Sequence, residues 1–306
     1  MTVTEKMKEV YKLLHNLDPR EVASKLGLNE GTVRRYDRAY RQEENAKPDN
    51  MAKVLLFDIE TTPMEVYAWH LYPKYIHIGQ IIKDWNIICW RAKWLFDDTT
   101  FGSCQTPEEA VERDDKRVTE ELWNAINEAD ILIAHNLRDF DIKKANTKFL
   151  QHDMLPPAPY QVIDTLKSAR KHFKFSSNKL DYLCQKLGIG AKIDTGFELW
   201  KEVLKGNENA LIAINEYCGR DVEILEDLYL KLRPYIKSHP NMALYLEGKE
   251  NKCTNCGSDK LSYASKPYYT PTGVYQAFRC EDCGAILRSR QTIHKRDKEL
   301  LRSTAR

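Results

Sequence analysis

The sequence lacks a long hydrophobic run. No stretch of the 306 residues approaches the roughly 18 consecutive apolar residues of a membrane span, and the first residues lack the apolar segment of a secretory signal. Extended disorder is also excluded, because 42% of the residues are hydrophobic and 30% are charged, as in ordinary globular proteins. We therefore expect a folded cytoplasmic protein that does not associate with a membrane.

A large excess of one charge is also absent, although the charges are unevenly placed. The net charge is +2, but residues 51–247 carry 25 basic and 30 acidic side chains, whereas residues 248–306 carry 12 and 6. An acidic body therefore precedes a basic tail. Because Lys and Arg neutralise phosphates, such a tail suits a nucleic-acid partner. A tail that only adds solubility has the same composition.

Cysteine is scattered through most of the chain and clustered near its end. Four cysteines are interpreted as small buried residues in a reducing compartment: Cys89, Cys104, Cys184 and Cys218. The other four form two Cys-x-x-Cys pairs with 23 residues between them, Cys253 with Cys256 and Cys280 with Cys283. Two such pairs supply the four thiolates of one structural Zn²⁺ ion, and disulfides are the alternative. We predict that residues 248–306 form a zinc ribbon and a basic tail.

Residues 1–41 are predicted to form a small helical module. Gly27 can adopt the positive φ of a tight turn between two helices, Asn29 can cap the second helix, and Val33 can pack it on the first. The pattern resembles a helix-turn-helix, in which the second helix would present three arginines to nucleic acid: Arg34, Arg35 and Arg38. A helical hairpin used for packing or protein contact is the alternative.

Residues 42–51 are predicted to be a linker, and residues 52–247 alternate strand and helix signals. Apolar and β-branched residues predict strands over 54–57, 66–69, 86–96 and 131–134. Helical spacing of apolar residues predicts helices over 108–129, 142–150, 180–187 and 209–236. This alternation indicates an α/β domain with one central sheet flanked by helices.

Two carboxylates follow the first predicted strand. Asp58 and Glu60 lie two residues apart, so their side chains point to the same side of a strand. Like charges held this close repel each other, and the arrangement is costly unless a cation lies between them. We therefore predict a divalent metal site at this strand end. A solvated strand terminus is the alternative.

Two later segments carry further candidate residues. Asn136 and Asp141 follow the strand predicted at 131–134, where turn-forming residues can direct a carboxylate over the edge of the sheet. Tyr217 and Asp221 have i, i+4 spacing and therefore share one face of a predicted helix. A helix lying across the sheet could bring both groups to the first strand.

These residues resemble the three motifs of the DEDD, or DnaQ-like, 3′-5′ exonuclease superfamily, in the variant with a tyrosine in the third motif. The motifs are Asp58-x-Glu60, Asn136 with Phe140-Asp141, and Tyr217-x-x-x-Asp221. The resemblance covers residues 52–236 and implies a ribonuclease-H-like fold with a mixed central sheet. Its combination with a helix-turn-helix-like segment and a zinc ribbon suits a phage or mobile-element protein, which would act in the host cytoplasm.

The resemblance also implies roles for these residues. Two Mg²⁺ or Mn²⁺ ions, about 3.5–4 Å apart, would be held by four carboxylates: Asp58, Glu60, Asp141 and Asp221. Tyr217 would orient the attacking water, since the ordinary pKa of tyrosine, near 10, is high for a general base. Asn136 would support the loop or the substrate, and Asp164 is interpreted as structural.

The implied reaction releases nucleoside 5′-monophosphates from a 3′ end, with DNA favoured over RNA as substrate. A separate polymerase or replication protein is a candidate partner. Two other hypotheses use the same sequence features. The first is a transposase- or resolvase-like endonuclease on the same fold, and the second is a nucleic-acid-binding protein without catalysis.

Overall fold

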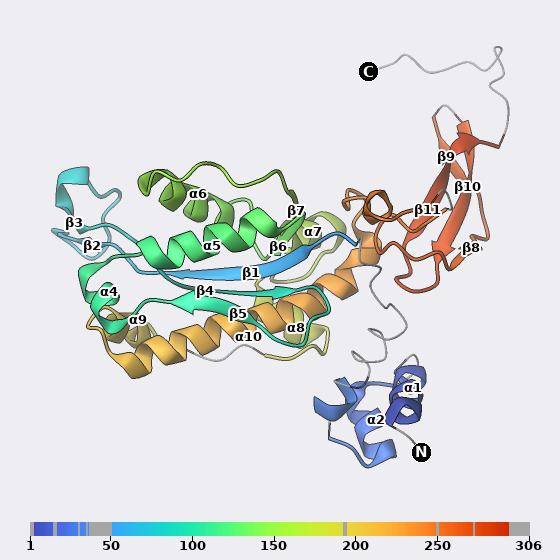
Figure 1. Cartoon of the computed structure of the whole chain (residues 1–306), viewed down its shortest axis with the longest axis horizontal. Helices are drawn as coiled ribbons and strands as arrows, with labels where there is room; N and C mark the ends of the chain where they lie inside the picture. Colours follow the sequence, from blue (N-terminus) through green and yellow to red (C-terminus); the bar gives the residue numbers. More distant parts are fainter. Residues whose placement is uncertain are drawn as a thin grey trace. The chain divides into compact units, whose positions relative to one another are not determined.

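The protein is seen in a computed structural model that describes residues 3–14, 17–29, 31–34, 36, 51–191, 195–248, 251–271 and 273–293 (Figure 1). The chain divides into two compact units, Met1–Met51 and Ala52–Arg306. No helix in the described part of the chain is both long and apolar enough to cross a lipid bilayer.

The first unit is helical, as predicted. It contains α1 (Val3–Leu13) and α2 (Pro19–Leu26), and the chain leaves α2 through Gly27, whose φ is 63°. The Asn29 side chain then accepts a hydrogen bond of 2.7 Å from the backbone N–H of Thr32, at the start of a further helical segment.

A small apolar core holds these helical segments together. Val10, Val22 and Val33 come from the three segments and are fully buried against one another. Arg34 is half-buried, whereas Arg35 and Arg38 lie outside the described residues, as do residues 42–50 of the predicted linker. Binding of nucleic acid by this unit therefore stays a prediction.

The second unit is built around a mixed sheet of five described strands in the order β5-β4-β1-β6-β7. These strands are β1 (Val54–Thr61), β4 (Ile87–Trp94), β5 (Phe101–Cys104), β6 (Ile131–Ala134) and β7 (Gln161–Asp164). β1 pairs antiparallel with β4 and parallel with β6, and β7 continues the parallel half. The predicted α/β fold with a mixed central sheet is confirmed.

Helices cover both faces of this sheet (Figure 1). The helices of the second unit are α4 (Pro107–Glu112), α5 (Lys116–Glu128), α6 (Asp141–Gln151), α7 (Thr165–His172), α8 (Leu180–Lys186), α9 (Glu198–Val203) and α10 (Glu208–Leu232). α5 and α6 lie over one face, and the 25-residue α10 crosses the other face against β1 and β4. Burial on both faces explains the continuous apolar run with which β1 begins.

Successive side chains of β1 point alternately to the two faces of the sheet, so alternation determines which helices each side chain contacts. Leu55, Phe57 and Ile59 pack into the core beneath α5 and α6. Because successive strand residues point to opposite faces, Asp58 and Glu60 must point toward α10. The apolar positions of β1 therefore aim its two acidic side chains at the longest helix of the unit.

The structure differs from the sequence-based expectation in several places, which include the unpredicted helices α7 and α9. The single helix predicted over 108–129 is wrong, because α4 ends at Arg113, which has a left-handed backbone with φ 62°. The strand predicted over 66–69 is wrong beyond Val66. The short strands β5 and β7 were not predicted as strands, because each contains polar residues or glycine and lacks the continuous apolar run that identified the equally short β6.

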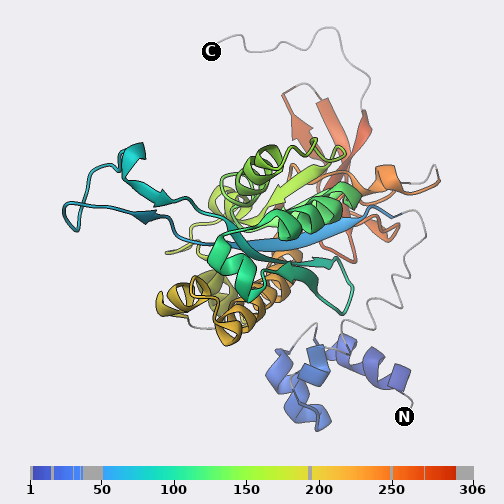
Figure 2. The same cartoon turned by 60° about the vertical axis from the view of Figure 1, so that its left-hand side comes forward.

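Residues 63–85 leave the sheet after β1 and return into β4, and we call this segment the arm. It contains β2 (Glu65–Val66), a 3-10 turn η1 (Ile78–Gln80) and β3 (Ile81–Lys83). β2 and β3 pair antiparallel with each other and are not part of the central sheet. Figure 2 shows the arm projecting from the end of the sheet.

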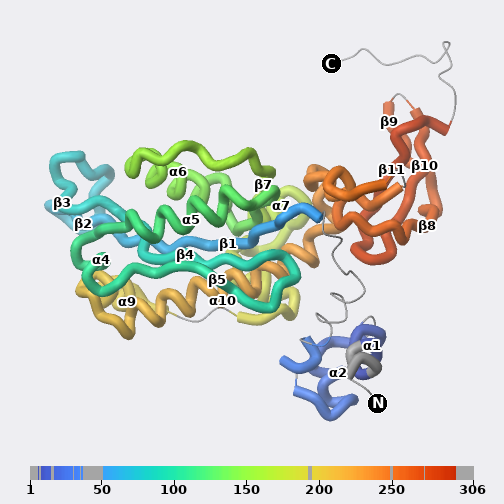
Figure 3. Tube along the Cα trace, viewed as in Figure 1, coloured from blue at the N-terminus to red at the C-terminus, as the bar shows by residue number. Residues whose placement is uncertain are grey.

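After α10 the chain continues through two short 3-10 helices into a second sheet (Figure 3). The 3-10 helices are η2 (Arg233–Tyr235) and η3 (Met242–Tyr245), and the strands are β8 (Leu261–Tyr263), β9 (Tyr268–Thr270), β10 (Gly273–Cys280) and β11 (Ile286–Thr292). β10 is central and pairs antiparallel with each of the other three. This small sheet lies in the segment predicted to be a zinc ribbon.

A buried ion pair fixes α10 to the sheet. Lys93 of β4 pairs with Glu226 of α10, and the two side chains are 1% and 2% exposed. The second oxygen of Glu226 accepts a hydrogen bond of 2.8 Å from the backbone N–H of Phe96. Both charges are therefore neutralised without water, and the pair sets where α10 crosses the strands.

Replacing Lys93 alone should destabilise the protein strongly. Lys93→Met leaves the Glu226 carboxylate buried without its cation, which costs about 3–5 kcal/mol. Lys93→Met combined with Glu226→Gln should recover more than half of that loss, because the amide oxygen can still accept from Phe96. Urea denaturation measures the free energies of unfolding. A single-variant loss below about 1 kcal/mol would contradict the assignment of a buried ion pair.

Candidate metal centres

Three carboxylates from distant parts of the sequence meet on the α10 side of the sheet. Asp58 and Glu60 come from β1, and Asp221 comes from α10. One ligand atom of each lies within 4.8 Å of the ligand atoms of the other two. Three anionic oxygens at this spacing are compatible with a hard divalent cation, which prefers oxygen ligands.

A fourth carboxylate lies next to this group in a more buried position. Asp141 is the first residue of α6 and is 1% exposed. Neither of its carboxylate oxygens has a hydrogen-bond partner of good geometry among the described residues, and only the backbone N–H groups of Ile59 and of Asp141 itself approach them. Burial, and then the negative charge of Asp58, raise the pKa of Asp141 well above its usual range. Asp141 is not part of the 4.8 Å group, but its carboxylate is close enough to Asp58 to interact with it.

The donors fit a divalent metal. Two orphaned oxygens on a buried carboxylate are costly, and the cost rises with each negative charge nearby. A cation supplies the missing partner and removes the repulsion at the same time. Asp58, Glu60 and Asp221 could hold it directly, and Asp141 could complete the set.

The thiol of Cys218 lies close enough to this cluster for the negative charges of the carboxylates to raise its pKa. Its thiol lies 3.3 Å from the backbone oxygen of Asp58 and 3.7 Å from the Asp58 carboxylate. Burial raises the pKa of Cys218 to about 12, and the charges of Asp58, Glu60 and Asp221 act in the same direction. The thiol is therefore protonated and donates toward Asp58. Sequence reasoning treated Cys218 only as a buried residue, although its place between Tyr217 and Asp221 was a usable signal.

Sequence reasoning also did not identify Arg91 as a neighbour of the carboxylate cluster. It lies directly opposite Asp58 in the β1–β4 register, so the two side chains share the face under α10. Its guanidinium donates to the hydroxyl of Thr100 at 2.5 Å and to the carbonyl of the same residue at 3.2 Å. The partner of Asp58 across the sheet depends on strand register, which no local pattern in the sequence specifies.

The remaining predicted residues lie on α10 and at or just after the ends of β6 and β7. Tyr217 is half-buried on α10, and its ring lies edge-on to Trp200 of α9 with 6.3 Å between centroids. Asn136 has a left-handed backbone, with φ 82°, and its carbonyl accepts from the N–H of Phe140 at 3.0 Å. Asp164 ends β7 and caps α7, accepting from the N–H of Lys167 at 3.0 Å.

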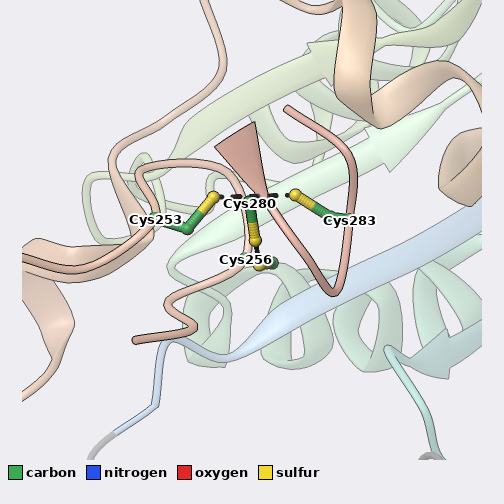
Figure 4. Close-up of side chains that lie close together, drawn as sticks. All are labelled: Cys253, Cys256, Cys280 and Cys283. Atoms are coloured by element: carbon green, nitrogen blue, oxygen red, sulfur yellow. Dashed lines mark hydrogen bonds between the residues drawn. The ribbon is translucent and has the colours of Figure 1, made fainter. Parts of the chain in front are cut away.

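The four clustered cysteines form a second candidate centre (Figure 4). The sulfur atoms of Cys253 and Cys283 are 3.6 Å apart, as are those of Cys256 and Cys280, and all four cysteines are free. With Zn–S bonds of about 2.3 Å, sulfur atoms in a tetrahedral site lie about 3.8 Å apart. Hydrogen bonds from Cys253 and Cys256 also lower the pKa of Cys280, which favours its thiolate. The cluster is therefore compatible with zinc.

Two equivalent turns shape this cluster. The glycines after the two pairs, Gly257 and Gly284, have φ of 81° and 77°. Their N–H groups donate to the carbonyls of Cys253 and Cys280 at 2.8 and 2.9 Å. Each turn thus directs two sulfur atoms inward, and positive φ explains why a glycine follows each pair.

The cysteine cluster is joined to the end of α10. The Asn255 side chain, between the first two cysteines, donates to the carbonyl of Arg233 at 2.9 Å. The N–H of Met242 donates to the carbonyl of Thr254 at 2.8 Å. A metal that orders the first cysteine turn would therefore also order the segment that follows α10.

Neutralising Asp141 should stabilise the protein when no divalent cation is bound. A carboxyl group whose folded pKa exceeds its unfolded value stabilises the fold when protonated, and this contribution is lost as pH rises through the folded pKa. Without Mg²⁺ or Mn²⁺, Asp141→Asn should therefore raise the melting temperature near neutral pH by at least about 2 °C. Calorimetry as a function of pH measures this, and the gain should vanish at acidic pH.

Asp139→Asn provides a matched control two residues away. Asp139 is exposed, and hydrogen bonds from Lys167 and then Lys143 lower its pKa, so its neutralisation removes a favourable charge. Added Mg²⁺ should raise the melting temperature of the wild type and of Asp139→Asn but not that of Asp141→Asn. Equal responses of all three proteins would show that Asp141 does not belong to a cation site.

The cysteine cluster should contain one zinc ion per chain. Cys280→Ser removes one of the four ligands and should reduce the zinc content by more than half, with a lower melting temperature because metal binding contributes directly to folding. Elemental analysis of the purified protein measures the zinc. Cys104→Ser is the control and should retain the full content. Equal zinc in both variants would contradict this assignment.

Comparison with known proteins finds a likeness over part of the second unit. Residues 94–233 match the family model of the RNase H superfamily; this segment begins after β1, so Asp58 and Glu60 lie outside it. Among solved structures, the chain is similar to the family B DNA polymerase from the hyperthermophilic archaeon Pyrobaculum calidifontis, with 17% identity and a TM-score of 0.44. The alignment covers 60% of this chain and 25% of that chain. Comparison with curated proteins gave no match. Residues 94–233 of the second unit are therefore similar to the RNase H superfamily, and the match does not extend to β1.

Proposed function

We propose that the protein is a metal-dependent nuclease that removes nucleotides from the 3′ end of a nucleic acid, with DNA favoured as the substrate. The observation that carries this proposal is the convergence of Asp58, Glu60 and Asp221 within 4.8 Å, beside the buried carboxylate of Asp141. The RNase H superfamily match supports it in part, because residues 94–233 include Asp141 and Asp221, whereas Asp58 and Glu60 lie outside the match.

The ligand chemistry determines the class of reaction. Two hard divalent cations bound to these carboxylates would supply an activated water and stabilise the leaving oxygen of a phosphodiester. Asp58, Glu60 and Asp221 would bind and position the cations, and Asp141 would complete their shell from α6. Tyr217 lies one helical turn before Asp221 and would orient the attacking water by hydrogen bonding. Nucleoside 5′-monophosphates are the expected products.

The proposed domains have different roles, one in catalysis and two in binding nucleic acid. Residues 52–247 would carry the nuclease site, while the helix-turn-helix-like module at 1–41 and the zinc ribbon and tail at 248–306 would add affinity for nucleic acid. Positive charge supports the second role, since residues 248–306 carry 12 basic and 6 acidic side chains and the body is acidic. A separate polymerase or replication protein is the proposed protein partner, and the proposed location is the cytoplasm, or the host cytoplasm for a phage protein.

Loss of a direct ligand should abolish nucleotide release. Positioning partners of metal ligands are worth about 10–100-fold in activity, so Asp221→Asn should lower release by at least about 100-fold. The control is Glu223→Gln, which neutralises an exposed carboxylate on the same helix and should leave release unchanged. The substrates are single- and double-stranded DNA and RNA, with Mg²⁺, Mn²⁺ or neither. A 5′-end label follows the shortening of the strand, and a 3′-end label follows the released mononucleotides.

The products and the substrate topology distinguish the competing functions. A 3′-5′ exonuclease shortens the labelled strand stepwise and leaves a circular single strand intact, because it needs an end. Cleavage of the circle would instead support the transposase- or resolvase-like endonuclease. Binding without release under any metal condition would support a protein that only binds nucleic acid, and equal release by wild type and Asp221→Asn would reveal a contaminating nuclease.

A further inference from the structure

The arm exposes an unusual amount of aromatic surface. Four of its aromatic side chains are largely solvent-accessible: Tyr67 at 71%, Trp69 at 94%, Tyr72 at 88% and Tyr75 at 81%. Neighbouring aliphatic residues are exposed as well, with Leu71 at 90% and Ile78 at 83%. Exposed apolar patches of this kind in a soluble protein mark a surface that binds something.

The charges of the arm identify the class of ligand. From Tyr67 to Lys83 the sequence contains no Asp or Glu, but it contains Lys74, Lys83, His70 and His77. This segment emerges from a body whose charge is otherwise acidic. Aromatic side chains interleaved with cations, and free of carboxylates, suit a polyanion whose monomers carry flat rings. Unpaired nucleic acid has this chemistry, because each nucleotide supplies one phosphate and one base.

The arm is anchored where the sheet meets the carboxylates. Thr62, two residues after Glu60, donates its backbone N–H to the carbonyl of Asn86 at 2.9 Å, and their side chains are hydrogen-bonded at 2.7 Å. Two residues of extended chain span about 7 Å, so the root of the arm lies next to the candidate metal centre.

An arginine outside the arm holds both of its ends. The Arg113 side chain is 9% exposed and donates to the Thr62 hydroxyl at 2.9 Å and to the carbonyl of Asp84 at 3.2 Å. It also forms an ion pair with Glu65 at the start of the arm. Farther out, the backbone N–H of Tyr67 donates to the carbonyl of Gln80 at 2.8 Å. The arm is therefore an ordered projection whose root lies beside the carboxylates and whose exposed aromatic residues lie farther out along it.

We propose that the arm, whose root lies beside the metal centre, binds single-stranded nucleic acid by stacking unpaired bases on Trp69, Tyr72 and neighbouring rings. Lys74 and Lys83 contribute by neutralising phosphates. This inference deepens the proposed nuclease function, on which its biological meaning rests, by naming an unpaired strand as the form of substrate that the site receives. Duplex DNA lacks accessible base faces and cannot use these rings in the same way.

Alanine substitutions at the exposed rings should weaken binding of a single strand. One stacked base strengthens binding by about fivefold to 150-fold, so Trp69→Ala with Tyr72→Ala should raise Kd at least about tenfold. The probes are fluorescent oligo-dT and oligo-rU of about 12 nucleotides, within the usual range of site sizes. Fluorescence anisotropy is measured on the full-length protein without added Mg²⁺ or Mn²⁺, so that no cleavage occurs.

Two further variants distinguish base stacking from nonspecific hydrophobic binding. Trp69→Phe with Tyr72→Phe keeps two π faces and should retain Kd within about threefold, whereas Trp69→Leu with Tyr72→Leu keeps apolar surface and should bind as poorly as the alanine variant. Leu155→Ala removes a 79% exposed side chain outside the arm and should bind like the wild type. A blunt duplex of equal length should be less sensitive to the arm substitutions.

Several results would overturn the proposal. Unchanged Kd in the alanine variant, retained affinity in the leucine variant, or no binding of single strands by the wild type would each do so. Sedimentation analysis adds another outcome: if the wild type self-associates and only that association is lost in the alanine variant, the arm is a contact between two copies of the chain.

Binding and cleavage fail separately in this design. If the protein binds single strands through Trp69 and Tyr72 but releases no nucleotides with Mg²⁺ or Mn²⁺, this inference stands and the proposed nuclease function is wrong. If the protein is a metal-dependent nuclease but its Kd for single strands is unchanged when both rings are replaced, the proposed function stands and the arm is not its binding site.

Discussion

The packing of α10 against the central sheet is the contact on which the candidate metal centre depends. Asp58 and Glu60 are placed by β1, but Asp221 has no nearby chain connection to them, so α10 must cross the sheet in one position. The buried Lys93–Glu226 pair sets that position. A Cβ atom at Gly219 would lie 3.5 Å from Nε of Arg91, an ordinary van der Waals distance, so α10 lies directly against this side chain of β4. A small shift of α10 would separate the carboxylates.

The same packing creates an electrostatic cost. Asp141 is buried without a hydrogen-bond partner of good geometry among the described residues, beside a group of three further carboxylates. Burial, and then nearby negative charge, raise the pKa of both Asp141 and Cys218. Apolar side chains at these positions would stabilise the fold more. The structure therefore concentrates negative charge where a cation must compensate for it, whereas Lys93 and Glu226 compensate for each other. This contrast separates a binding site from a structural ion pair within one helix–sheet contact.

Local patterns in the sequence were sufficient for some of these features and insufficient for others. Alternation along β1 placed Asp58 and Glu60 on one face, spacing predicted the cysteine cluster, and apolar runs located β6 and α10. The break at Arg113 was missed because that side chain is held by the distant residues Thr62 and Asp84. Arg91 and Cys218 were missed for a related reason, since strand register and helix placement create their contacts with Asp58. The arm was missed because its aromatic residues are typical of a buried strand, yet they lie in solvent.

The central claim is that Asp58, Glu60 and Asp221 form a divalent cation site. The most direct measurement is a crystal structure of the full-length protein soaked with Mn²⁺, recorded at a wavelength where manganese scatters anomalously. The account predicts anomalous peaks within about 2–2.6 Å of carboxylate oxygens from all three residues, with Asp141 turned toward the same density. Manganese bound only elsewhere, or none between these carboxylates at saturating concentration, would contradict it.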